Sequence, residues 1–327
     1  MAKHPVWILC FDGIQPLDVV GPHEVFAGVG TILAGRGVAG AGYDVRLVAA
    51  TPGPIRSESG LALVAPDALP LDPSGTVVVP GGAGARHSVG DDALVGWVRQ
   101  AAASADRIAS VCTGSFLLAA AGVLDGLSAT THWARAQQLA DDFPAVDVQV
   151  DPLYVRQGKV WTSAGVTAGI DLALAIVEED HGAEVAHIAA RWLVMFVRRP
   201  GGQSQFAGPV WTAPAPPGPV RAAQELIDAA PEADHRIPAL ASRVGMSPRH
   251  LSREFTRLVG ISPGRYVEQV RVEHARRLLE TEPVTVAAAA SRCGFGSAET
   301  MRLAFLRRVG APPDHYRRRF ATSDVLT

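Results

Sequence analysis

Residues 108–121 have the sequence IASVCTGSFLLAAA. The first four residues favour a strand and the apolar run from residue 116 favours a helix, so the chain turns sharply between them at Cys112. A strand followed at once by a helix is the unit from which α/β domains are built. We therefore predict that Cys112 lies at a strand-to-helix corner of such a domain.

The same alternation extends over the first 200 residues. Strand-like runs lie at 6–11, 43–49, 76–79, 107–111, 146–150 and 160–163, and helix-like runs lie between them at 18–29, 92–103, 114–121, 134–140, 165–179 and 184–196. Several strands are apolar on consecutive residues, as in strands that helices cover on both faces. The pattern predicts a doubly wound α/β fold with a parallel sheet.

A change of composition marks a domain boundary. Residues 213–219 read APAPPGP, and proline fixes φ and removes backbone donors, so this part of the chain is predicted to be extended. After it the strand signal disappears, and helix-like runs occupy 220–229, 237–244, 248–259, 263–280, 286–293 and 298–309. We predict an α/β domain at 1–199, a linker at 200–220 and an all-α domain at 221–327.

Charge is divided unevenly between the two parts. The chain has 327 residues and a net charge of −2, but the part from residue 221 carries 17 arginines, no lysine and 12 acidic residues. This part is therefore basic and the part before it acidic, which suggests two roles and an anionic partner for the second.

Other features exclude several classes of protein. We find no apolar run near the roughly 18–20 residues of a membrane span, and no signal peptide, so we expect a cytoplasmic protein. Cys10, Cys112 and Cys293 are too few and too far apart for a disulfide framework or a zinc site. No metal and no other cofactor is predicted.

Cys112 has a functional and a structural interpretation. At a helix N-terminus the dipole stabilises a thiolate, and such a corner can hold a strained nucleophile. A free cysteine is also often a small buried apolar residue.

Two other features converge on this corner. Gly82, in the PGGAG run after strand 76–79, offers backbone N–H groups to an anion or forms a plain tight turn. Asp18 follows the first strand, and the carboxyl ends of parallel strands share one edge, where ligands bind. It is placed to hydrogen-bond the Cys112 thiol or, alternatively, to cap a helix.

These motifs resemble a known family. SVCTG at 110–114, LDG at 124–126, ATTHW at 129–133 and FDG at 11–13 resemble the PfpI-type, class I glutamine amidotransferase-like superfamily over about residues 4–197. The resemblance implies a flavodoxin-like sandwich with the cysteine on an elbow and a carboxylate beside it.

One position departs from the protease members of that superfamily. They carry histidine directly after the cysteine, where this chain has Thr113, so no adjacent imidazole can act as a base. The motif resembles instead the isonitrile hydratase branch and the sensor domains of transcription regulators. His132 either lines the same pocket or is hydrogen-bonded at a strand end.

The second domain contains two similar helical units. In the first, Gly245 ends one helix and Ser247 caps the next, which buries Leu251 and Phe255. The outer face of this second helix carries Arg249, His250, Ser252, Arg253 and Arg257. An apolar seam opposite an arginine-rich face is typical of a helix that enters the major groove.

The second unit repeats this pattern 50 residues later. Gly294 and Gly296 form the turn, Ser297 caps the next helix, and Met301 and Phe305 face inward. Ala298, Glu299, Thr300 and Arg302 face outward. Arg307, Arg308 and residues 317–319 are candidates for phosphate contacts, and Cys293 is predicted to be packed.

The two units resemble the AraC/XylS-type DNA-binding domain over about residues 222–320. The resemblance rests on GISP at 260–263, Ala275-Arg276, CGF at 293–295, Pro312-Pro313 and Tyr316. It implies that the outward residues of both units face bases or backbone in two successive major grooves. Leu303 stands where this family often has a basic residue.

Three functions are compatible with these patterns. The first is a transcriptional regulator, expected to be a homodimer, that binds double-stranded DNA and senses a small metabolite near Asp18, Gly82, Cys112, Thr113 and His132. The second is a hydratase-type enzyme with Cys112 as nucleophile and Asp18 as general base, and not a protease. The third is a redox sensor that depends on an exposed Cys112 thiol of low pKa.

Overall fold

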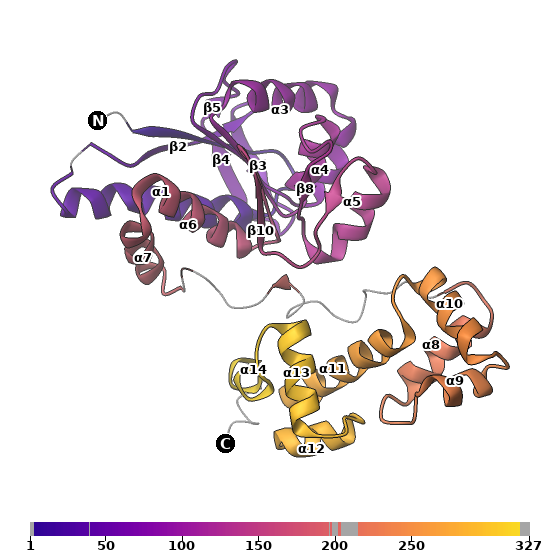
Figure 1. Ribbon diagram of the computed structural model, residues 1–327. Coiled ribbons are helices and arrows are strands. Elements are labelled where there is room, and N and C mark those ends of the chain that lie inside the picture. The colour runs from indigo at the N-terminus through magenta and orange to yellow at the C-terminus, as the bar shows by residue number, and fades with distance from the viewer. Residues whose placement is uncertain (1–2, 39, 196, 198–201, 204–214, 321–327) are drawn as a thin grey trace. The chain divides into compact units, whose positions relative to one another are not determined.

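The computed structural model describes residues 3–38, 40–195, 197, 202–203 and 215–320 (Figure 1). Contacts divide the chain into two compact units, Met1–Arg199 and Pro200–Thr327. Of the predicted linker, residues 200, 201 and 204–214 lie outside the described residues. Its last two residues belong to a helix, since helix α8 (Pro219–Ala229) begins at Pro219, whose fixed φ suits a first helical position.

The first unit is built on a seven-stranded sheet. The strand order is β10 (Tyr154–Gln157), β11 (Val160–Ser163), β7 (Arg107–Val111), β6 (Thr76–Val79), β1 (His4–Leu9), β2 (Tyr43–Ala49) and β5 (Asp67–Ala68). All neighbours are parallel except β10, which pairs with β11 antiparallel at the edge. The central strand β6 is buried along its whole length, as a strand covered on both faces must be.

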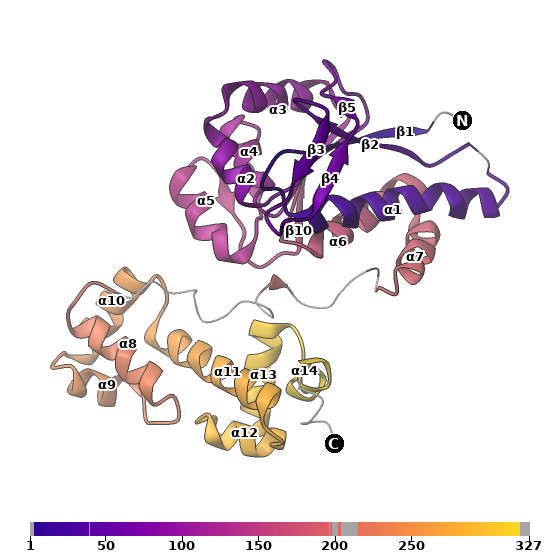
Figure 2. The same ribbon diagram turned by 180° about the vertical axis from the view of Figure 1, so that it is seen from behind.

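Helices cover both faces of the sheet. They are α1 (Pro16–Gly35), α2 (Ala83–His87), α3 (Asp92–Ser104), α4 (Gly114–Ala120), α5 (Ala136–Asp142), α6 (Ala168–His181) and α7 (Ala183–Trp192). Helices α1, α6 and α7 contact one another on one side, and α4 contacts both α2 and α3 on the other (Figures 1 and 2). The predicted doubly wound, flavodoxin-like sandwich is confirmed.

Several element boundaries differ from the prediction. The first strand spans His4–Leu9 instead of residues 6–11, because the chain turns away to form α1. That helix begins at Pro16 because the Gln15 side chain caps it by accepting from the Leu17 N–H. The pair β3 (Gly53–Arg56) with β4 (Ala62–Ala65) was not predicted. The strand predicted at 146–150 is reduced to β9 (Asp147–Val148), which pairs with the unpredicted β8 (Ser128–Ala129).

Helix α1 is long and apolar enough to cross a membrane by length and composition alone. It packs against α6 and α7 instead, and buries residues such as Val25, Phe26 and Val29 in the core of the first unit. We therefore assign it as a core helix.

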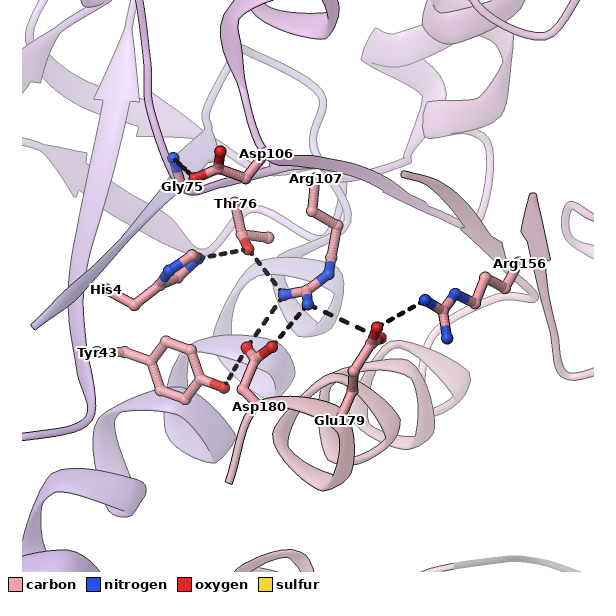
Figure 3. Close-up of polar contacts among 9 residues, drawn as sticks. All are labelled: His4, Tyr43, Gly75, Thr76, Asp106, Arg107, Arg156, Glu179 and Asp180. Atoms are coloured by element: carbon pink, nitrogen blue, oxygen red, sulfur yellow. Dashed lines mark hydrogen bonds and ion pairs between the residues drawn. The ribbon is translucent and has the colours of Figure 1, made fainter. Parts of the chain in front are cut away.

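A polar cluster closes the amino-terminal edge of the sheet (Figure 3). The guanidinium of Arg107 donates to both carboxylate oxygens of Asp180, at 2.7 and 3.1 Å, and to the Thr76 hydroxyl at 3.1 Å. The Tyr43 hydroxyl donates to Asp180 at 2.8 Å, and His4 Nε2 lies 3.0 Å from Thr76 Oγ1. The cluster therefore ties the first residues of four strands to the end of α6.

The described residues of the second unit form helices joined by turns and loops, with no strand. It contains α8, α9 (Ile237–Arg243), α10 (Pro248–Val259), α11 (Pro263–Thr281), α12 (Val286–Arg292), α13 (Ala298–Val309) and α14 (Pro313–Phe320). The all-α prediction is confirmed. Helix α14 was not predicted because its sequence is mostly charged and only a few residues, such as Tyr316, are buried.

Helix α11 lies between the two helix-turn-helix units and packs against both (Figure 2). Its first turns bring Tyr266 and Val267 into one apolar cluster with Leu251 and Phe255 of α10. Its later turns contribute to a second cluster, which includes Met301 and Phe305 of α13. At 1.5 Å per residue, α11 is roughly 28 Å long, so a rigid rod joins the two units.

Candidate effector site and DNA-binding surface

Cys112 is held in a left-handed conformation between β7 and α4. Its φ is 55°, a region that costs a non-glycine residue energy and persists only where surrounding contacts enforce it. The Cys112 N–H lies 3.1 Å from both the Ser163 and the Ala164 carbonyl oxygens, and its own carbonyl accepts from the Thr131 hydroxyl at 2.9 Å. The predicted elbow is therefore present.

The environment of the thiol differs from the prediction. Cys112 is 7% exposed. Burial and the nearby Asp18 carboxyl raise the pKa of the thiol, and hydrogen bonds from Thr113 oppose this only in part. The expectation of an exposed thiol with a low pKa is wrong, because the side chain is buried and desolvation disfavours the charged thiolate.

Asp18 lies in the first turn of α1 and is fully buried. Its Oδ2 accepts from the Gly81 N–H at 3.0 Å. Its Oδ1 forms no hydrogen bond of ordinary geometry with any described residue, although the Val166 N–H and the Cys112 thiol lie near enough to lower the pKa. Burial is the larger effect and raises the Asp18 pKa to about 7. The capping alternative is wrong, since Gln15 is the cap.

Asp18→Asn is expected to remove one component of the pH dependence of stability. The folded-state pKa lies above the unfolded value of about 3.9, so ionisation of Asp18 destabilises the fold as pH rises from about 4 to about 7. The difference in melting temperature, variant minus wild type, should therefore increase from pH 5 to pH 8 in thermal unfolding scans. A difference that is constant over this range would contradict the prediction.

The glycine-rich loop after β6 has no free N–H group among residues 81–84. Gly81 donates to Asp18, Gly82 to the Thr113 hydroxyl at 2.9 Å, Ala83 to Glu58 at 2.8 Å and Gly84 to a carbonyl at 2.9 Å. The prediction that this loop offers donors to an anion is therefore wrong. These N–H groups instead hold the loop against Asp18, Thr113 and Glu58.

Thr113 follows the elbow residue directly, and His132 lies against Gly165, the residue after Ala164. The Thr113 hydroxyl donates to the Gly82 carbonyl at 2.9 Å, which locks the loop onto α4. His132 Nδ1 accepts from the Ala134 N–H at 3.2 Å, and burial lowers the His132 pKa. A Cβ on Gly165 would come within 2.0 Å of His132 Cδ2, so the ring rests on the backbone beside Ala164. His132 is hydrogen-bonded, as one of its two interpretations predicted, and its place in a pocket with Cys112 stays a prediction.

A cavity of about 440 Å³, a size that suits a small ligand, lies beside the glycine-rich loop, since its lining residue Gly13 accepts from the Gly84 N–H. None of the predicted site residues Asp18, Gly82, Cys112, Thr113 and His132 lines it. It is lined by Asp12, Gly13, Pro54, Ile55, Arg56, Ser57, Gly60 and Ala62. Sequence reasoning named Asp12 and Gly13 only as part of the FDG motif. It missed the other six residues, because the β3–β4 hairpin that supplies them is short and carries no motif. Within the described residues, no cluster of three or more His, Cys, Asp or Glu side chains is placed to bind a metal.

The first predicted reading helix, α10, has an apolar inner and a basic outer face. Leu251 and Phe255 are fully buried, whereas Arg249, His250, Arg253 and Arg257 are exposed and Ser252 is half-buried. Glu254 accepts from Arg253 at 3.2 Å and from Arg257 at 2.9 Å. Two arginines therefore share one carboxylate, and the face keeps a positive charge.

The second predicted reading helix, α13, buries Met301 and Phe305 completely. Its outer face carries the predicted residues Ala298, Glu299, Thr300 and Arg302, of which Glu299 and Thr300 are exposed and the other two half-buried. The neighbouring arginines are engaged within the unit, since Arg307 and Arg308 both donate to Glu268 of α11, at 2.6 and 3.0 Å. Cys293 is packed as predicted, and burial raises its pKa to about 11.

Comparison with known proteins gives the same division. Residues 4–179 match the DJ-1/PfpI family, and residues 240–319 match a helix-turn-helix domain. The chain is 37% identical over 264 residues, 77% of its length, to the HTH-type transcriptional regulator Rv1931c of Mycobacterium tuberculosis (strain ATCC 25618 / H37Rv), and covers 98% of that protein.

One further relative matches about half of the chain, and one solved structure shares the fold. An isonitrile hydratase of Pseudomonas putida is 36% identical over 187 residues, 56% of this chain and 75% of that enzyme. The crystal structure of a ThiJ/PfpI family protein from Pseudomonas syringae aligns with a TM-score of 0.52 and 26% identity, over 83% of this chain and 91% of that one.

The fold and the two sites define a class of protein in which a cysteine-elbow α/β domain precedes a DNA-binding domain with two helix-turn-helix units. The chain belongs to the DJ-1/PfpI family and joins that family's domain to an AraC-type helix-turn-helix domain.

Proposed function

We propose that this protein is a sequence-specific DNA-binding transcriptional regulator that works in the cytoplasm and responds to a small metabolite. The observation that carries this proposal is the C-terminal unit. Two helices of equal length, each capped by serine, present outer faces from the ends of one shared rod. That arrangement suits two successive major-groove turns, which lie about 34 Å apart on one side of a duplex.

The proposed contacts to DNA are the outward residues of both helices. On α10 they are Arg249, His250, Ser252, Arg253 and Arg257, and on α13 they are Ala298, Glu299, Thr300 and Arg302. Arginine forms its most specific contact with the two acceptors of guanine, so α10 is suited to read guanine bases. Contacts to phosphates release counterions, so binding should weaken steeply with added salt.

Arg253→Ala tests the DNA-binding proposal. With duplexes that the full chain selects from a randomised pool, the variant is expected to lose about 5- to 150-fold in affinity, or about 1–3 kcal/mol. Affinity is measured by fluorescence anisotropy at fixed salt. Arg46→Ala is the control, because Arg46 is an exposed, ion-paired arginine of the first unit. Equal losses on selected and unrelated duplexes would assign Arg253 to a phosphate instead of a base.

The proposed effector site lies at the carboxyl edge of the sheet, near Asp18, Gly82, Cys112, Thr113 and His132, with the neighbouring cavity as space for the ligand. Its buried donors and acceptors are largely satisfied, so a ligand would act by displacing a few of these contacts. We propose that the active form is a homodimer. Ligand binding must then differ between the DNA-competent form and the other form, as thermodynamic linkage requires.

A residual hydratase activity is the second candidate function, and the elbow geometry together with the relationship to isonitrile hydratase favours it. In that reaction Cys112 would act as nucleophile and Asp18 as base. The raised pKa of the buried Cys112 side chain indicates that it is a protonated thiol, and not a thiolate, in the free protein. We expect Cys112→Ser to keep the effector-dependent change in DNA affinity, and loss of that change would favour thiol chemistry.

A further inference from the structure

The two reading helices are equivalent in position. Both contain 12 residues, both begin directly after a serine cap (Ser247 or Ser297), and both end at a glycine with positive φ (Gly260 or Gly310). Residues of α13 therefore correspond to residues of α10 at an offset of 50, which allows a comparison position by position.

Their outer faces differ in chemistry at these equivalent positions. Residues at i, i+3, i+4 and i+7 share one face of a helix. On α10 these are Arg249, Ser252, Arg253 and Thr256, and on α13 they are Glu299, Arg302, Leu303 and Leu306. Leucine thus replaces an arginine and a threonine on the face opposite the apolar core.

The charges on this face of α13 cancel. Arg302 donates to both oxygens of Glu299, each at 2.7 Å, so the guanidinium is engaged by a carboxylate of the same helix. The other two residues of this face are apolar leucines. Leu303 is 42% exposed and Leu306 is 37% exposed, while Met301 and Phe305 already fill the core behind them.

We propose that Leu303 determines specificity by contacting the C5-methyl group of thymine in the major groove, with Leu306 extending the apolar surface. Among the groups that base pairs present in that groove, the thymine methyl is the apolar one, and uncharged side chains contact it. This inference rests on the proposed function, because it requires α13 to enter the groove. It assigns guanine recognition to α10 and thymine recognition to α13.

The test uses duplexes selected by the full-length chain from a randomised pool. Each thymine is replaced in turn by deoxyuridine, which removes only the methyl group, and affinity is measured by anisotropy at fixed salt. We expect wild-type protein to lose about three- to fivefold at one or two thymines in one half of the site, as burial of a single methyl predicts. In Leu303→Ala these losses should vanish, and in Leu303→Met, which keeps an apolar side chain, they should persist.

Two controls separate this inference from general effects. Arg253→Ala should weaken binding but keep the deoxyuridine losses, and Leu303→Arg should move the preference at that position from thymine to guanine. Circular dichroism checks that each variant is folded. Equal losses in wild type and Leu303→Ala, or no loss at any thymine, would overturn the inference. If the wild-type chain selects no sequence at all, the proposed function itself fails.

Discussion

Replacement of Gly114 by alanine is expected to lower the free energy of unfolding of the first unit by about 3 kcal/mol or more. Gly114 is the first residue of α4, directly after the elbow, and its backbone lies against the end of β6. An added Cβ would approach the Val79 carbonyl oxygen to 2.0 Å and the Pro80 carbonyl oxygen to 2.8 Å. Both obstacles are backbone atoms, so relief requires a shift of the helix or the strand.

Gly96→Ala is the matched control for this prediction. Gly96 lies inside α3, where an added Cβ meets nothing within 4 Å. Alanine should therefore stabilise the helix by about 0.5–1 kcal/mol through its higher helix propensity. Chemical denaturation followed by circular dichroism measures both variants. Similar free energies for Gly114→Ala and wild type would show that α4 is not seated as tightly against β6 as these distances indicate.

Arg107→Ala is expected to destabilise the first unit by about 2–4 kcal/mol. The guanidinium is the centre of the polar cluster at the amino-terminal edge of the sheet, with its side chain 12% exposed and that of Asp180 21% exposed (Figure 3). Removal of one partner leaves the other as a largely buried charge without compensation, which costs more than the ion pair contributes.

Arg156→Ala isolates the effect of burial. Arg156 also pairs with a carboxylate, at 2.6 Å from Glu179, and also lies over the Trp161 ring, but its side chain is 52% exposed. An exposed pair of this kind contributes about 0–1 kcal/mol. The double variant Arg107→Ala/Asp180→Ala should recover part of the single-variant loss. Equal effects of Arg107→Ala and Arg156→Ala would contradict the assigned role of burial.

Local sequence patterns predicted much of the fold. The strands at 43–49, 76–79, 107–111 and 160–163 have the predicted bounds, because short apolar runs of β-branched residues favour buried strands wherever they occur. Helices α10 and α13 were also predicted with the observed bounds, because serine caps and glycine ends mark them in the sequence. The β3–β4 hairpin was missed, since its strands are short and one begins with Gly53-Pro54.

The environment of the candidate site could not be predicted in the same way. The position of Cys112 on an elbow follows from its own neighbours in sequence, but its burial depends on α1, on Thr131 and on the end of β11, which are distant in sequence. The donors of the glycine-rich loop are likewise taken by Asp18 and Glu58. Pairings such as Glu268 with Arg307 and Arg308 arise only when α11 and α13 pack together.

The difference between the outer faces of α10 and α13 bears on the orientation of the DNA half-sites that the protein would prefer. If both helices contact bases as proposed, the two different surfaces would prefer a half-site whose two ends differ in sequence. If that half-site were inverted, each helix would meet the base pairs meant for the other. If it were moved along the DNA by one helical repeat, each helix would still meet its own base pairs. Two copies of the chain would thus distinguish direct from inverted repeats by polarity alone.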